Sequence, residues 1–146
     1  ELEEVKAKVA ERKALELPSP RLACMLLTER GAFVLGRAGA PVALAEVCGA
    51  VSVFGDGTPS PLNAEAFSAA KPDVILVYSG ELKRLGGLDK LLALPGVSLT
   101  PAGQNKHIVA MDYELLSGWG PRLGIAAQRL FHGFYEVDGP SVDERP

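Results

Sequence analysis

The sequence predicts an α/β domain of three layers, α/β/α, with helices on both faces of a mainly parallel central sheet. Short, continuously apolar segments alternate along the chain with amphipathic ones, and strands that are buried on both faces have this pattern. The chain has 146 residues, which suits one domain with a substantial core.

The composition narrows the class of protein. Hydrophobic residues make up 47% of the chain and charged residues 23%, which is ordinary for a globular protein. Its apolar runs stay well short of the roughly 20 residues that span a bilayer. A net charge of −3 without a basic stripe argues against nucleic acid as the main partner. Cys24 and Cys48 lie in apolar segments, which indicates two buried thiols; a disulfide between them is the open alternative.

The first half of the chain begins with a polar helix. Its apolar stripe is Leu2, Val5 and Val9, and the sequence "LPSP" that follows ends the helix. The elements expected here are a helix over 2–15, a buried strand over 21–28, a short strand over 32–36, a helix from Pro41 to Cys48 and a short strand over 51–54.

The second half continues the alternation. Asn63 is placed to cap a helix, and Pro72 prevents that helix from continuing. The elements expected here are a helix over 64–70, a buried strand over 73–77, a short helix near 88–93, a strand over 107–111 and an amphipathic helix from about Pro121 to Phe134. Residues 136–146 have too little apolar content to pack, so we expect a frayed tail.

The position of a ligand site follows from the predicted sheet, because ligands of open α/β sheets gather beyond the carboxyl ends of the strands. The residues at these ends are Thr28, Glu29 and Arg30, then Phe54 with a Gly-rich loop, then Tyr78 and Ser79, and finally the stretch from Tyr113 to Trp119. A tyrosine and the only tryptophan, with charge nearby, suit a flat amphipathic ligand or a protein surface. Packing roles for Tyr78 and Trp119 remain alternatives.

Catalytic constellations are missing from the sequence. It has no nucleophile elbow, no paired-carboxylate motif and no Cys–His pairing. His107 falls at the amino end of its strand and is expected at the surface. His132 lies late in the last helix and is expected to interact favourably with the helix dipole there. The two cysteines and two histidines form no metal-site pattern. These observations favour binding over catalysis.

Three stretches carry a family resemblance by their order and spacing. They are "PLNAEAFSAAKPDVILVYSG", "GGLDKLLALPGVSLTPAGQNKHIVAMD" and "LLSGWGPRLGIAAQRL". Over residues 1–135 the chain resembles the carboxy-terminal lobe of bacterial periplasmic substrate-binding proteins, and most of all the haem-binding components of haem ABC importers. Vitamin B12 and siderophore binders are related groups.

The resemblance implies two α/β lobes that are joined by one long helix, with the ligand between them. Residues 1–16 would then be the end of the connecting helix, 17–135 the carboxy-terminal lobe and 136–146 a flexible tail, with the amino-terminal lobe absent from this sequence. A single lobe would hold only half of the ligand's contacts.

The resemblance also implies roles for individual residues. Glu65 matches an exposed glutamate that docks on an arginine of the membrane permease; a solvated helix glutamate is the alternative. Tyr78 is implied as a ligand of haem iron or as a stacking wall. Some relatives place a histidine in the turn that reads Thr28-Glu29-Arg30 here, so this chain departs from them, which argues against a histidine ligand from this lobe. Arg30 is instead placed to pair with a propionate or another carboxylate.

Further residues follow from the same resemblance. Trp119 lies in a stretch that often reads "GFGPR" in relatives and is implied to pack against a porphyrin face, while Arg122 holds the loop. Glu29 and Ser79, which the rule on the carboxyl ends of strands places at the same edge, complete the ligand-facing set.

As a whole, the resemblance implies a binding protein without catalysis, periplasmic or lipid-anchored at the cell surface, that delivers haem to a permease. A ferric siderophore or cobalamin as cargo, or a stand-alone interaction domain, are the alternatives.

Overall fold

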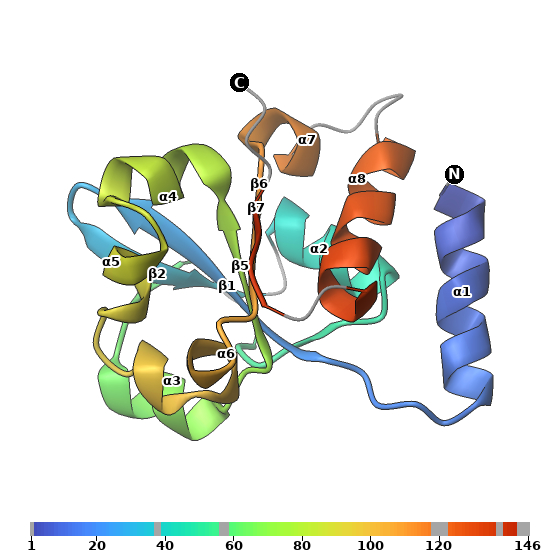
Figure 1. Ribbon diagram of the computed structural model, residues 1–146, viewed down its shortest axis with the longest axis horizontal. Helices are drawn as coiled ribbons and strands as arrows, with labels where there is room; N and C mark the ends of the chain where they lie inside the picture. Colours follow the sequence, from blue (N-terminus) through green and yellow to red (C-terminus); the bar gives the residue numbers. More distant parts are fainter. Residues whose placement is uncertain (1, 37–38, 56–58, 118–122, 137–138, 143–146) are drawn as a thin grey trace.

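The computed structural model describes residues 2–36, 39–55, 59–117, 123–136 and 139–142. In these residues seven strands form one sheet, and helices lie on both of its faces (Figure 1). The strands are β1 (Arg21–Thr28), β2 (Gly31–Leu35), β3 (Val51–Ser52), β4 (Ser60–Pro61), β5 (Val74–Tyr78), β6 (Ile108–Met111) and β7 (Ser141–Val142).

The sheet is mainly parallel, as predicted. Its strand order is β4-β2-β1-β5-β6-β7, with β3 paired to β1. β1, β3, β5, β6 and β7 pair in parallel, whereas β2 is antiparallel to β1 and β4 is antiparallel to β2. The antiparallel edge arises because a tight turn after Thr28 returns the chain directly along β1.

Two layers of helices cover the sheet. One layer holds α1 (Leu2–Ala14), α2 (Ala40–Val47), α7 (Tyr113–Ser117), α8 (Leu123–Phe131) and the π-helical turn η2 (His132–Glu136). The other holds α3 (Ala64–Ala70), α4 (Ser79–Leu85), α5 (Leu88–Leu92), the 3-10 turn η1 (Val97–Leu99) and α6 (Pro101–Gln104). Alternate strand residues face the two layers, so each layer has its own apolar core. The three-layer prediction is therefore confirmed.

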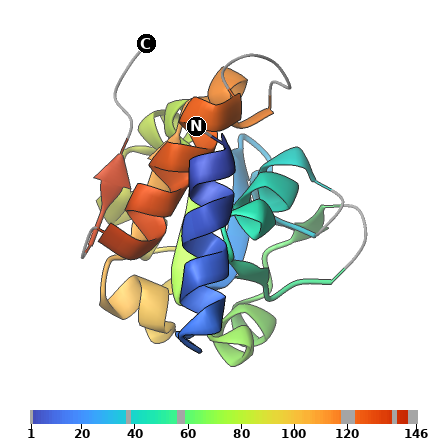
Figure 2. The same ribbon diagram turned by 90° about the vertical axis from the view of Figure 1, so that its right-hand side faces the viewer.

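The helix α1 packs against the lobe by one stripe. Val5 and Val9 are buried, as their spacing predicts. At its carboxyl end, the Arg12 guanidinium lies 3.9 Å from the centre of the Tyr135 ring. The Tyr135 hydroxyl donates a hydrogen bond of 2.8 Å to the carbonyl oxygen of Cys48. Figure 2 shows α1 running alongside α8, so the first helix is part of this packed unit.

The cap of α3 is confirmed. The Asn63 Oδ1 atom accepts a hydrogen bond of 2.9 Å from the amide of Ala66. The helix ends at Lys71, which has a left-handed φ of 51°, directly before Pro72.

Several segments differ from the predictions. Helix α4 was not predicted, because in "SGELKRL" only Leu82 is buried and no apolar stripe is visible. The strand expected over 51–54 is limited to Val51–Ser52. Ser141 and Val142, expected in a frayed tail, instead pair with Val109 and Ala110 of β6. The otherwise open edge of β6 supplies the backbone partners for this short strand.

Both cysteines are free and buried, in agreement with the prediction of two thiols. Burial raises the pKa of Cys48 to about 12, and its thiol donates to the carbonyl oxygen of Ala127 at 3.4 Å. Among the described helices, none combines the length and apolar character that a membrane span requires.

Candidate ligand-binding rim

The carboxyl ends of three neighbouring strands, β1, β5 and β6, form the edge that the sequence marked as a ligand site. We call this edge the rim and define it as residues 28–30, 78–79 and 111–114. The amino-terminal turn of α1 lies at the same end of the molecule as α7 in both views (Figures 1 and 2). The rim and the amino-terminal end of α1 therefore lie at the same end of the molecule.

The hairpin between β1 and β2 forms the first part of the rim. The Thr28 hydroxyl donates to the carbonyl oxygen of Gly31 at 2.8 Å and accepts from the amide of Arg30 at 3.1 Å. Gly31 has a φ of +121°, a conformation that suits glycine. The turn leaves Glu29 and Arg30 exposed, and the Arg30 guanidinium makes no hydrogen bond or ion pair with the described residues. Arg30 is thus a positioned cation that is available to an anion.

A crevice separates this hairpin from α4. β1 pairs with β5 only from Leu22 to Cys24, so the two strands part toward the rim. There the amide of Leu27 donates instead to the Glu81 Oε1 atom at 2.8 Å. The crevice has a volume of about 600 Å³ and is lined by Leu27, Thr28, Glu29, Glu81, Arg84 and Leu85.

Two tyrosines meet on the other side of the rim. Tyr78 is only 6% exposed and belongs to the core that includes Met111 and Leu115. Tyr113 is 61% exposed, and its ring centre lies 4.9 Å from that of Tyr78 at an interplanar angle of 55°. Asp112 holds the start of α7, because its Oδ2 atom accepts from the amide of Leu115 at 3.2 Å. The exposed aromatic ring among the described rim residues is therefore that of Tyr113.

The residues that we proposed from the sequence as ligand contacts lie on different elements. Arg30 and Glu29 lie on the hairpin, and Ser79 begins α4 directly after Tyr78. Trp119 and Arg122 lie outside the described residues. Tyr113 was part of the stretch expected at the rim but was not singled out. Asp112 before it is a recognisable helix cap, but this signal places only the start of α7 and does not show that the Tyr113 ring is exposed.

Phe54 is a correction. We expected it on the same rim, but β3 pairs with Arg21 and Leu22 at the amino end of β1. Its carboxyl end therefore lies far down the sheet, and Phe54 packs on Phe67 of α3 with ring centres 6.0 Å apart.

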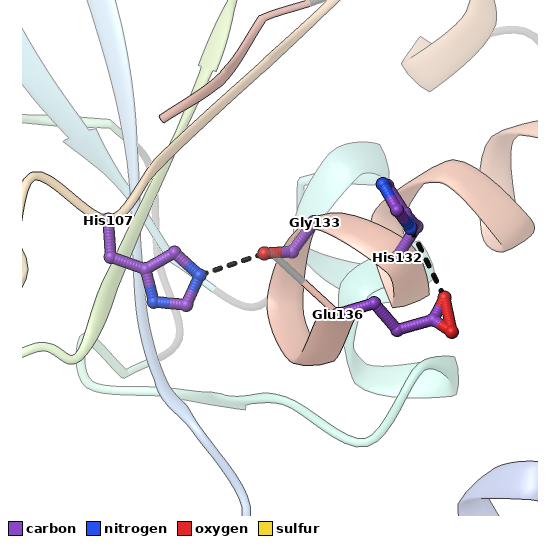
Figure 3. Close-up of polar contacts among 4 residues, drawn as sticks. All are labelled: His107, His132, Gly133 and Glu136. Atoms are coloured by element: carbon purple, nitrogen blue, oxygen red, sulfur yellow. Dashed lines mark hydrogen bonds and ion pairs between the residues drawn. The ribbon is translucent and has the colours of Figure 1, made fainter. Parts of the chain in front are cut away.

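Neither of the two histidines lies at the rim; Figure 3 shows the contacts that they make instead with Gly133 and Glu136. His107 precedes β6, at its amino end, and its Nε2 atom donates to the carbonyl oxygen of Gly133 at 2.8 Å. It is partly buried rather than a free surface residue. The His132 Nδ1 atom lies 3.2 Å from the Glu136 Oε1 atom within η2. Any side-chain ligand that this lobe offers from its rim is therefore not an imidazole.

Glu65 lies apart from the rim. It is exposed in the first turn of α3, at the opposite end of the molecule (Figure 1). α3 is seated against the turn before η1, where a Cβ atom on Gly96 would come within 2.6 Å of the carbonyl oxygen of Ala64. The backbone that carries Glu65 is thus well supported.

The rim thus carries an exposed aromatic ring, an exposed guanidinium that no described residue pairs with, and a crevice beside the hairpin of that guanidinium. These groups suit a flat, anionic molecule. The comparisons with known proteins concern the fold and the family of the chain. The family model described as periplasmic binding protein matches residues 1–115. The chain belongs to this family, and its fold is that of one lobe. No curated protein gave a significant match.

Solved structures give more detail. The periplasmic haem-binding protein RhuT from Roseiflexus sp. RS-1 is 32% identical, with a TM-score of 0.81, over 92% of this chain and 53% of its own. The haem-binding protein BhuT, solved with two haems, is 35% identical, with a TM-score of 0.79, over 90% of this chain and 52% of its own. The vitamin B12 binding protein BtuF of Vibrio cholerae is 18% identical, with a TM-score of 0.69, over 91% of this chain and 49% of its own, and shares the fold. The chain therefore spans about half the length of these proteins.

Proposed function

We propose that this chain is the carboxy-terminal lobe of the substrate-binding component of an ABC importer, and that its cargo is haem. The observation that carries the proposal is the identity of 32% and 35% to two haem-binding proteins over nine-tenths of the chain, against 18% to a vitamin B12 binder. The proposed protein works in the periplasm or as a lipid-anchored protein at the cell surface, without catalysis.

The contacts proposed for haem come from the rim. Arg30 pairs with a propionate, because its guanidinium is exposed and uncommitted among the described residues. Glu29 and Ser79 flank it as polar contacts. Tyr78 was expected as an iron ligand, and its burial limits such a contact to the small part of the side chain that reaches the surface. Trp119 is retained as a candidate for packing against the macrocycle.

In this proposal a second lobe completes the site. The relatives are about twice as long as this chain, and half a site holds half of the contacts. The experiments on haem therefore use the natural full-length protein that carries this lobe.

The proposed cargo is tested by ligand-induced stabilisation. A ligand that binds only the folded state raises the unfolding temperature. Haemin, cyanocobalamin and a ferric siderophore are each added to the full-length protein. We expect haemin alone to raise the midpoint in a saturable way. Stabilisation by cyanocobalamin or by the siderophore instead would contradict haem and identify the cargo class.

The role of Arg30 is tested in the same assay and by haemin titration. Arg30→Gln removes the charge and keeps a polar side chain, so we expect haemin affinity to fall about three- to tenfold. Lys13→Gln is the matched control, because Lys13 is an exposed cation in the last turn of α1. Equal affinities of the two variants would contradict the propionate contact.

Glu65 is proposed to dock on the membrane permease. An exposed carboxylate at the end opposite the rim can steer a transient contact without touching the ligand. We expect Glu65→Ala to lower haem transport by the reconstituted importer several-fold while haemin affinity stays unchanged. Glu11→Ala on α1, also an exposed helix glutamate, serves as control. Undiminished transport by Glu65→Ala would show that Glu65 is merely solvated.

A further inference from the structure

The rim carries one exposed aromatic side chain whose role the proposed function leaves unassigned. Tyr113 is 61% exposed, although it packs against the ring of Tyr78, which is almost completely buried. A large aromatic ring that is exposed and yet held in place at the expected ligand edge is a candidate contact for a flat ligand.

The position of Tyr113 is fixed from two sides. Below its ring lies Tyr78, which the core around Met111 and Leu115 holds in turn. The backbone of Tyr113 is held because Asp112 caps the first turn of α7, where its Oδ2 atom accepts from the amide of Leu115. A ring fixed in this way loses little side-chain freedom when a flat ligand covers it, so the contact is made at a low entropic cost.

Its surroundings indicate what the ring would contact. Tyr113 follows β6, which lies beside β5 at the same carboxyl-end edge that carries Arg30 on the neighbouring β1 hairpin. The first turn of α1 lies at this end of the molecule, so a lobe joined through α1 would face the same edge (Figures 1 and 2). Tyr113 and Arg30 therefore lie on the same edge of the sheet, after two strands that β5 separates.

We propose that Tyr113 is the aromatic wall of this lobe, packing its ring against the face of a planar porphyrin, with Tyr78 as the platform that positions it. This inference rests on the proposed function, since the ligand it names is a flat anionic macrocycle. It assigns contact with the macrocycle to Tyr113, not to Tyr78, and it requires the ring of residue 113 rather than its hydroxyl.

The test is a haemin titration of the full-length protein, followed by absorbance in the Soret region, with variants at position 113. Tyr113→Ala removes the ring and should weaken haemin binding about five- to tenfold. Tyr113→Phe keeps the ring and should restore most of that affinity. The Soret maximum should stay in place in both variants, because the iron ligand is not changed.

Leu99→Ala is the matched control, since Leu99 is 67% exposed but lies on η1, away from the rim. Its affinity should equal that of the unchanged protein. Wild-type affinity in Tyr113→Ala would overturn the inference. A Soret shift or a loss of affinity in Tyr113→Phe equal to that in Tyr113→Ala would overturn it as well, because the hydroxyl would then be the essential group.

The two proposals fail in different ways. If the unchanged protein gives no saturable haemin signal, haem itself is the wrong cargo. If the unchanged protein binds haemin and the Tyr113 variants bind equally well, only the role of Tyr113 is wrong. Circular dichroism of each variant verifies that the fold is retained.

Discussion

Among single residues, Tyr135 links three elements of the molecule. Its hydroxyl reaches the carbonyl oxygen of Cys48 at the end of α2, and its ring lies between Arg12 of α1 and Phe131 of α8. The ring centres of Phe131 and Tyr135 are 4.4 Å apart. Tyr135 therefore adds a contact at the carboxyl end of α1 to those that the buried Val5 and Val9 make.

Removing the Tyr135 hydroxyl should destabilise the protein. Tyr135→Phe keeps the ring contacts but leaves the Cys48 carbonyl oxygen without this donor, so we expect a loss of about 1 kcal/mol. Tyr113→Phe is the control, because its side chain is exposed and a surface change of this kind stays within about 0.5 kcal/mol. Denaturant unfolding of both variants measures the difference; equal stabilities would contradict the structural role.

The same residue predicts a dependence on pH. Burial raises the pKa of Tyr135 above its ordinary value of 10.0, and the nearby Arg12 charge opposes part of this rise. The folded state therefore holds the phenol proton more tightly than the unfolded state. This contribution is fully present below pH 10 and is lost as the pH rises further. The stability of the unchanged protein should fall more steeply above about pH 10 than that of Tyr135→Phe; parallel curves would contradict this prediction.

For the structural elements, the sequence predicted those with a strong apolar pattern. The runs at β1, β5 and β6, the stripe of α1 and the Asn63 cap all appear where expected. Helix α4 was missed because tertiary contacts hold it, namely the burial of Leu82 and the bond from Leu27 to Glu81. Strand β7 was missed because the open edge of β6 supplies its hydrogen bonds.

The candidate site was predicted in outline. The rule that ligands lie beyond the carboxyl ends of strands led to Arg30 and Tyr78, and both are at the rim. The degree to which Tyr78 is buried could not be predicted, because it depends on where α7 packs. The position of Phe54, away from the rim, likewise follows from the register of β3 on the amino end of β1, which no local pattern encodes.

Two glycines in helices should respond in opposite ways to alanine. A Cβ atom on Gly103 in α6 would clash with the carbonyl oxygen of Val97, so Gly103→Ala should destabilise the fold by about 1–3 kcal/mol. Gly80 in α4 has open space around it, so Gly80→Ala should stabilise by about 0.5–1 kcal/mol. Thermal unfolding distinguishes the two, and the same sign for both would contradict the packing described.

In the whole molecule, α7 and the start of α1 lie at one end, and α3, which carries Glu65, lies at the other (Figure 1). Val5, Val9 and Arg12 hold α1 against this lobe. In the proposed two-lobed protein, α1 would therefore move with this lobe as one body. The two ends would serve the two proposed partners, ligand and permease, separately.

The most direct measurement of the central proposal is the absorbance titration of the unchanged full-length protein with haemin. We predict a Soret change that saturates at a fixed ratio of haemin to protein, as expected for a defined site. An absorbance that rises in proportion to added haemin, without saturation, would contradict haem as the cargo of this lobe.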